Sequence, residues 1–144
     1  MINYRLANVS DAAELKRLND AFNGDGCSSV EGIAISLKSN TNEIVCVAAD
    51  GDKLAGFCCG LEISSMCYPN KSGEVTELFV AEEYRRQGIG RRLINEMENE
   101  LAKRDVVNLC ILTGDDNIKA QSLYLSCGYE DAEEMVLEKD LLMF

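Results

Sequence analysis

Apolar and polar positions along the chain switch between the spacing of strands and the spacing of helices. Residues 74–80 carry branched and aromatic side chains in a strand-like run. Ile89, Leu93, Met97 and Leu101 then recur every four residues, as on one face of a helix. The change of spacing predicts a strand that leads through a turn into a helix.

The same reasoning predicts elements over the whole chain. Strands are expected at residues 2–6, 43–49, 54–63, 74–80 and 106–112, with a closing pair at 129–132 and 135–139. Helices are expected after Ser10, at 30–37, at 89–104 and after Asn117, with Ser10 and Asn117 as N-caps. This order predicts a single α/β domain over residues 1–144, with helices on both faces of a mixed, mostly antiparallel sheet.

Two segments of the sequence predict how strands pair. The turn at residues 50–53 (DGDK) is short, so the strands that it joins must be antiparallel. Residues 106–112 are largely apolar, as expected for a strand buried on both faces in parallel pairing.

Composition narrows the classes of function. The formal charge is −11, which argues against nucleic acid as a partner and suits a cationic ligand. No apolar run is long enough for a membrane span or a signal peptide. The seven cysteines show no metal-binding spacing and predict reduced, mostly buried thiols in a cytoplasmic protein without a metal. The absence of histidine removes the commonest general base.

The turn between the strand at 74–80 and the following helix is the strongest candidate for a binding site. It reads RRQGIG over residues 85–90, and arginines 85, 86, 91 and 92 surround its two glycines in an otherwise acidic chain. A glycine turn into a helix N-terminus suits a pyrophosphate, because unpaired N–H groups and a partial positive charge lie there. The alternative is a helix that merely begins after a turn, with solvated arginines. A P-loop is excluded because no Gly-Lys-Ser/Thr follows.

Two motifs in the predicted elements resemble those of the GNAT superfamily of N-acetyltransferases. The family signature Q/R-x-x-G-x-G/A is met by residues 85–90. A second family pattern is met by Asn117, Ala120, Leu123-Tyr124 and Gly128-Tyr129. The order of elements matches that family along the whole chain, so the resemblance implies a GNAT fold with a splayed central strand pair.

The resemblance also implies an activity and a ligand. Members transfer acetyl from acetyl-CoA to a primary amine. The pantetheine arm would pair with the backbone of Leu78, Phe79 and Val80 and with the amide of Asn117, for which simple N-capping is the alternative. An N–H of Leu78 or Phe79 would stabilise the oxyanion. The pyrophosphate site would consist of Arg85, Arg86, Gln87, Gly88, Ile89, Gly90 and Arg91.

Catalytic roles are expected for two side chains. The resemblance places the general acid at Tyr124, and the alternative is a ring that only packs in the core. Glu77 is the best candidate base, and strand alternation puts it on the face of Val75 and Phe79, opposite Leu78 and Val80. Glu77 as an acceptor-binding or surface carboxylate, with water as the base, stays open.

The charge of the chain bears on the amine acceptor. The acidic chain predicts a cationic small-molecule amine. An aminoglycoside-type acceptor and a peptide or protein amine are alternatives. A CoA-binding sensor or interaction module without turnover is an alternative of another class, and a homodimer stays open.

Overall fold

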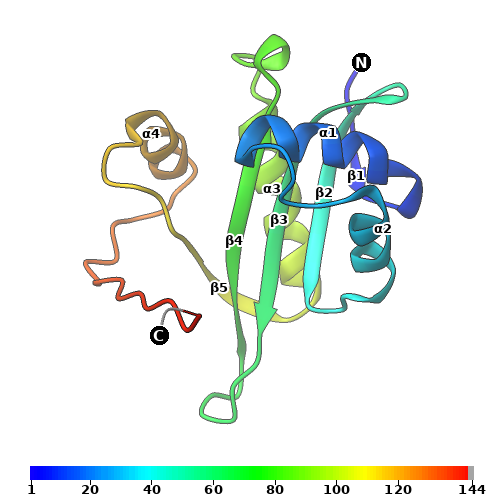
Figure 1. Cartoon of the computed structure of the whole chain (residues 1–144). Helices are drawn as coiled ribbons and strands as arrows, with labels where there is room; N and C mark the ends of the chain where they lie inside the picture. The colour runs from blue at the N-terminus through cyan, green and yellow to red at the C-terminus, as the bar shows by residue number, and fades with distance from the viewer. Residues whose placement is uncertain (143–144) are drawn as a thin grey trace. The chain divides into compact units, whose positions relative to one another are not determined.

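The computed structural model describes residues 1–142 and divides into two compact units. The first unit is Met1–Leu112, and the second begins at Thr113. The first unit contains a five-stranded sheet and three α-helices, and the second contains one short helix (Figure 1). The expectation of a single domain over residues 1–144 stays a prediction.

The elements of the first unit follow the predicted order. They are β1 (Asn3–Leu6), η1 (Val9–Asp11), α1 (Ala12–Asn23), α2 (Val30–Ser39), β2 (Glu43–Asp50), β3 (Lys53–Ile63), β4 (Lys71–Val80), η2 (Glu82–Tyr84), α3 (Ile89–Lys103) and β5 (Val106–Ile111). The second unit contains α4 (Ile118–Ser126).

The sheet is mixed and mostly antiparallel, as expected. Its strand order is β1-β2-β3-β4-β5, with antiparallel pairing from β1 to β4 and parallel pairing between β4 and β5. The hairpin turn between β2 and β3 is confirmed by the pairing of Asp50 with Lys53. Gly51 takes the left-handed conformation (φ 62°) that such a turn requires and that glycine adopts without steric cost.

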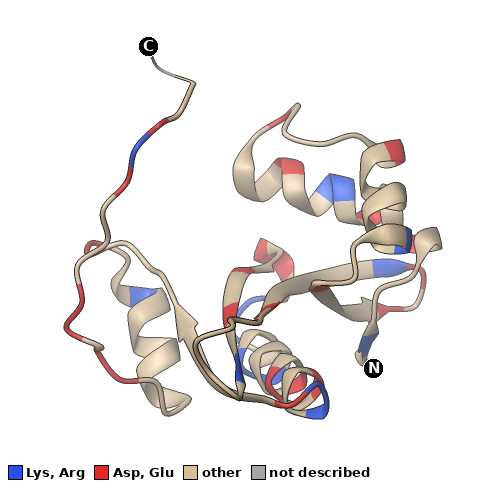
Figure 2. Ribbon diagram, turned by 90° about the horizontal axis from the view of Figure 1, so that it is seen from below, with Lys and Arg blue, Asp and Glu red and all other residues tan. Residues whose placement is uncertain are grey.

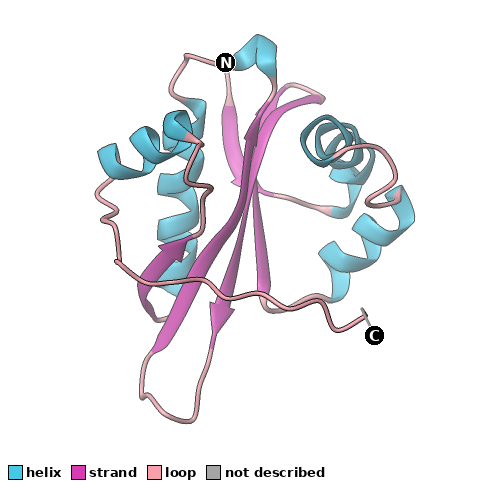
Figure 3. Cartoon of the chain, turned by 60° about the vertical axis from the view of Figure 1, so that its left-hand side comes forward, coloured by secondary structure: helices cyan, strands magenta, loops and turns pink. Residues whose placement is uncertain are grey.

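Helices cover both faces of this sheet (Figure 3). The predicted stripe of α3 is buried against one face, with Leu93, Met97 and Leu101 inaccessible to solvent. Leu15 and Leu18 of α1 pack on the opposite face, where they meet Phe57 of β3. Because both faces of β2 and β3 are covered, both strands are apolar almost throughout.

Two predictions about the C-terminal third of the chain are wrong. Strand β5 pairs in parallel as expected, but it is not buried on both faces, since Val107 is 65% exposed. Within residues 113–142 the structure contains no strand, so the closing pair at 129–132 and 135–139 does not form there (Figure 3). The segment is rich in acidic residues, which are depleted in strands.

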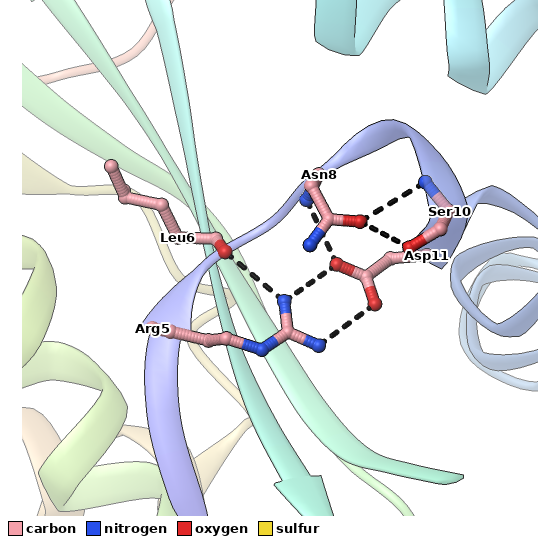
Figure 4. A network of polar contacts seen from close by, with 5 residues as sticks. All are labelled: Arg5, Leu6, Asn8, Ser10 and Asp11. Atoms are coloured by element: carbon pink, nitrogen blue, oxygen red, sulfur yellow. Dashed lines mark hydrogen bonds and ion pairs between the residues drawn. The ribbon is translucent and has the colours of Figure 1, made fainter. Parts of the chain in front are cut away.

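The N-terminal cap is also different from the prediction. The side chain that caps the start of the first helical segment belongs to Asn8, whose Oδ1 accepts from the Ser10 N–H at 3.0 Å and from the Ser10 hydroxyl (Figure 4). Asp11 completes a capping box by accepting from the Asn8 N–H at 2.8 Å. Arg5 of β1 binds the same carboxylate through two hydrogen bonds of 2.7 and 3.0 Å. Asn8 is favoured because this network anchors the helix start to the sheet.

None of the cysteines of the described chain is in a disulfide, but most of them, contrary to the prediction, are not buried. Cys46 and Cys58 are buried, whereas Cys27, Cys67 and Cys110 are exposed. Burial raises the pKa of the Cys46 thiol to about 12, so this thiol is protonated and unreactive at neutral pH. None of the helices within residues 1–142 is both long and apolar enough to span a membrane.

The Asp11 network predicts a pH-dependent stability. The Arg5 hydrogen bonds hold the pKa of the Asp11 carboxyl below its ordinary value, against the opposing effect of burial. This stabilisation is therefore fully present above the unfolded pKa of about 3.9 and is lost as the pH falls through the lowered folded pKa. We expect Asp11→Asn to reduce the free energy of unfolding by about 2 kcal/mol at pH 7. The difference from the unsubstituted protein should shrink in urea titrations at progressively lower pH.

The exposed carboxylate of Asp52 in the hairpin turn provides the control. Asp52→Asn removes the same charge without breaking the network, so its stability should follow that of the unsubstituted protein. An equal effect of both substitutions would show that net charge, and not the Asp11 network, sets the pH dependence.

Candidate active site

Strand β4 contains a β-bulge at Thr76. Cys59 of β3 pairs with Glu77 and the next residue, Gly60, pairs with Val75, so Thr76 is the extra residue. Its hydroxyl donates to the Cys59 carbonyl at 3.2 Å. A bulge bends a strand and increases its local twist.

The bulge corrects the predicted faces of β4. Val75 packs in the cluster of α3, together with Leu78, whereas Phe79 packs in the cluster of α1. Glu77 faces Cys59, which also packs against the α1 cluster. Glu77 therefore shares a face with Phe79, as predicted, but not with Val75, because one extra residue reverses the alternation.

Beyond the bulge, one edge of β4 has no neighbouring strand within the described chain. The parallel ladder with β5 ends at the pair Val75 and Ile111. On the other side, Ala81 N–H donates to the Ala55 carbonyl at 2.8 Å, and the register runs without a break from there to Glu77. Antiparallel pairs alternate between hydrogen-bonded and non-bonded, so the backbone groups of Phe79 point to β3 and those of Leu78 and Val80 point to the open edge.

This alternation decides between the two candidate oxyanion donors. The Phe79 N–H is directed into the ladder with β3, whereas the Leu78 N–H is directed to the open edge. Close approach of β3 and β4 at this point depends on Gly56, because a Cβ there would lie 2.6 Å from the Phe79 carbonyl oxygen. The geometry therefore favours Leu78 as the donor.

The turn after β4 has the geometry of an anion cradle. Arg86 (φ 65°) and Gly88 (φ 78°) both take left-handed conformations, and successive N–H groups in such turns form a concavity for anions. Gly88 is the N-cap of α3, and the first N–H to bond back to it is that of Arg92, at 3.1 Å. The preceding amides of the first turn are thus directed out of the helix end. The Ile89 side chain is buried in the core, so only its backbone can face a ligand.

The arginines around the turn have different surroundings. Arg85 donates from Nε to the Val80 carbonyl at 2.9 Å, and its guanidinium lies 5.6 Å from the centre of the Phe79 ring. Arg92 pairs with Glu96 at 3.2 Å, and its guanidinium lies 4.7 Å from the centre of the Tyr4 ring of β1, on a helix that carries charges of both signs (Figure 2). Arg85 therefore closes one carbonyl of the open edge, and Arg92 belongs to the helix surface.

Carboxylates lie on the sheet face that Glu77 shares with Phe79. Burial raises the pKa of Glu77. Burial and the charge of Glu77 raise the pKa of Glu43 on β2. The sequence analysis did not identify Glu43, because its proximity to Glu77 depends on the register of three strands. A raised pKa suits a carboxylate that accepts protons.

The two candidate residues of the second unit lie on α4. Asn117 is its N-cap and accepts from the Ala120 N–H through Oδ1 at 3.3 Å, so the predicted capping role is confirmed. The helix ends in a Schellman motif, in which Gly128 (φ 98°) donates to Leu125 and Tyr129 donates to the Tyr124 carbonyl, both at 3.1 Å.

The end of α4 also positions Tyr124. Its half-buried ring contacts Tyr129 edge-on, with ring centres 6.5 Å apart. This is the apolar contact that accompanies a Schellman motif. The Leu-Tyr and Gly-aromatic pairs of the sequence motif therefore have a local structural reason, and the Tyr124 ring packs against Tyr129 within its own unit.

The first unit thus brings together the open edge of β4, the anion cradle and Glu77, while Asn117 and Tyr124 are fixed within the second unit. An extended ligand with an anionic group could pair with the edge and end at the cradle. Among the described residues, no cluster of three or more cysteine, aspartate or glutamate side chains is arranged to hold a metal ion.

Comparisons with known proteins identify the family. The model of the acetyltransferase (GNAT) family matches residues 13–129. An uncharacterized N-acetyltransferase of Chlorobaculum tepidum is 27% identical over 135 residues, covering 90% of this chain and 76% of that protein. The uncharacterized N-acetyltransferase YhfO of Bacillus subtilis is 27% identical over 142 residues, covering 90% of this chain and 91% of that protein.

Solved structures share the fold. An aminoglycoside acetyltransferase from an uncultured soil metagenomic sample superimposes with a TM-score of 0.84 at 19% identity, covering 96% of this chain and 95% of that one. A ribosomal-protein-alanine N-acetyltransferase from Brucella melitensis gives a TM-score of 0.82 at 16% identity, covering 97% and 99%. The family match over most of the chain, on a fold with this strand edge and this turn, shows that the protein belongs to the GNAT family of acetyltransferases.

Proposed function

We propose that this protein transfers the acetyl group of acetyl-CoA to the primary amine of a cationic small molecule. The observation that carries the proposal is the open edge of β4 at Leu78 and Val80, which leads within a few residues into the N–H-rich turn at the start of α3. The edge offers alternating donors and acceptors to an extended amide chain, and the turn offers donors to phosphate. The order of these features matches the order of pantetheine and pyrophosphate along CoA.

The bound co-substrate would supply an activated acetyl thioester, and the chain would hold it in place. The arm would pair with Leu78 and Val80 and with the amide of Asn117, whose Oδ1 is used as the helix cap. The pyrophosphate would meet the amides from Gln87 to Arg91 and the charges of Arg86 and Arg91. Arg85 would support the edge through its Val80 bond and add positive charge nearby.

Three groups would act on the reaction. The Leu78 N–H would stabilise the negative charge that develops on the carbonyl oxygen. Glu77 would accept the proton of the attacking amine, for which its raised pKa is suited. Tyr124 would protonate the leaving thiolate, as the family resemblance implies.

Negative charge and a pair of stacked aromatic rings would attract the acceptor amine. The chain has 25 acidic and 14 basic residues, so the potential outside the arginine-rich turn favours a cation. Phe22 of α1 stacks on Phe79 with ring centres 5.0 Å apart, on the sheet face that carries Glu77. Carboxylate and aromatic groups together suit an ammonium group. The solved structures named above share the fold and differ in their named acceptors, so they leave this choice to experiment.

Thiol release from acetyl-CoA with a panel of amines tests the proposal. The panel should contain polyamines, aminoglycosides, a peptide with a free N-terminus and neutral amino acids. Turnover with cationic small molecules supports the proposal, and turnover with peptides alone would assign a protein or peptide acceptor. CoA binding without turnover on any amine would indicate a sensor.

We also propose that the protein works in the cytoplasm, because cysteines that form no disulfide suit a reducing compartment.

The cradle is tested by Gly90→Val in the first turn of α3. A side chain at this position would obstruct the approach of phosphate to the backbone, so we expect calorimetry to detect no acetyl-CoA binding while the circular dichroism spectrum is unchanged. Gly32→Val makes the same replacement in the first turn of α2 and should leave binding intact. Unchanged affinity in folded Gly90→Val would exclude this turn as the phosphate site.

The role of Tyr124 is tested by Tyr124→Phe, which keeps the ring contact with Tyr129. We expect kcat to fall by about 10²-fold because a positioned general acid is lost, with little change in the KM for acetyl-CoA. The free energy of unfolding should change by no more than about 1.5 kcal/mol. Tyr68→Phe, at a tyrosine that is 72% exposed, is the control. A kcat close to that of the unsubstituted enzyme would remove Tyr124 from the mechanism.

The role of Glu77 is tested by the pH dependence of kcat/KM. A base must be deprotonated, so activity should rise as the pH rises through the pKa of Glu77, which burial places above the ordinary glutamate value. Glu77→Gln should lower kcat by about 10²-fold and remove this part of the profile. Glu74→Gln, on the same strand, should keep the profile. If Glu77→Gln instead raises only the KM of the acceptor, Glu77 binds the amine and water is the base.

A further inference from the structure

The turn that forms the anion cradle requires support on both sides. Arg86 is a non-glycine residue in a left-handed conformation, which is sterically unfavourable and persists only where the surroundings hold it. On the C-terminal side, the turn runs into α3, whose Ile89 and Leu93 are buried in the core. On the N-terminal side, it follows η2, a single helical turn too short to be rigid by itself.

Tyr84, the last residue of η2, supplies that support. Its hydroxyl donates to Asp50 Oδ2 at 2.7 Å, and Asp50 is the last residue of β2. The Tyr84 ring packs against the core clusters on both sheet faces. The two residues are 34 positions apart, so this bond ties the cradle to the β2–β3 hairpin.

Neighbouring charges add to the same contact. Lys53 Nζ lies 5.7 Å from the centre of the Tyr84 ring and 3.4 Å from Glu83 Oε1. The Lys53 and Glu83 side chains are both about half exposed, so their ion pair contributes little by itself. The hydrogen bond to Asp50 raises the pKa of Tyr84, so the hydroxyl is protonated and able to donate at neutral pH. The Tyr84–Asp50 bond is therefore the polar contact that ties this side to the β2–β3 hairpin, and it acts beside the Arg85 bond to the Val80 carbonyl.

We propose that Tyr84 is a positioning residue for the phosphate-binding turn, which it holds in its binding conformation through the hydrogen bond to Asp50. This inference rests on the proposed use of acetyl-CoA. A turn that is already ordered loses less conformational entropy when it binds its ligand, so the bond increases affinity for the part of the ligand that meets the turn. It has no such effect on a ligand without phosphates.

The experiment compares two ligands by calorimetry: CoA, and pantetheine, which lacks the pyrophosphate. Tyr84→Phe keeps the ring and removes only the hydroxyl. We expect it to raise the Kd for CoA about tenfold and to change the Kd for pantetheine by less than about twofold. Asp50→Ala should have the same effect, and the double variant should be no weaker than either single one, because both remove one interaction. Asp50→Asn keeps an acceptor oxygen and should restore most of the affinity.

Tyr68→Phe is the control for this experiment, and it should bind both ligands as the unsubstituted protein does. If Tyr84→Phe does not fold, the Asp50 variants carry the same comparison. An equal loss for CoA and pantetheine, or unchanged CoA binding, would overturn the role of Tyr84 alone. Failure of the unsubstituted protein to bind CoA would overturn the proposed function and this role with it.

Discussion

Between Thr76 and Val80, strand β4 pairs on one side only within the described chain, and this one-sided pairing determines how the candidate site is built. The strand has β3 on one side, and its ladder with β5 ends at Val75. The bulge at Thr76 marks the point where the strand leaves the parallel ladder, and it determines which residues face each helix layer. It also directs the N–H groups of Leu78 and Val80 to the open edge. A single inserted residue thus determines the direction of both the open-edge backbone groups and the carboxylate of Glu77.

An open strand edge has unpaired backbone groups, and this chain covers its end locally. Arg85 donates to the Val80 carbonyl and lies over the Phe79 ring, so the strand end and the following turn are connected through a side chain. Tyr84 connects the same turn to the β2–β3 hairpin. The edge and the cradle are therefore held at a fixed separation by contacts within the first unit. Such preorganisation lowers the entropic cost of binding a long, flexible ligand.

Much of the fold and part of the site could be predicted, because the signals were local. The four-residue period of α3, the turn at Gly51, and the cap at Asn117 each depend on neighbours a few residues away. The turn at residues 85–90 was likewise identified from its glycines and arginines. Such signals do not show which residues far apart in the chain come together. Glu43 and the Tyr84–Asp50 bond were missed for this reason, since both involve residues more than thirty positions from their partners.

Local patterns in the sequence were enough to predict the order of the elements in the first unit, the apolar stripe of α3 and the glycine turn at its start, because periodicity and backbone preference act within one segment. The bulge at Thr76 depends on the register of β4 against β3, so it could be seen only in the folded chain, where it puts Val75 on the face opposite Glu77. The tertiary structure also decided that Asn8 caps the first helical segment, since Arg5 fixes Asp11 there. The strands expected at 129–132 and 135–139 do not form for a related reason. A strand forms only where it has a pairing partner and buries one face, and both conditions depend on the rest of the chain.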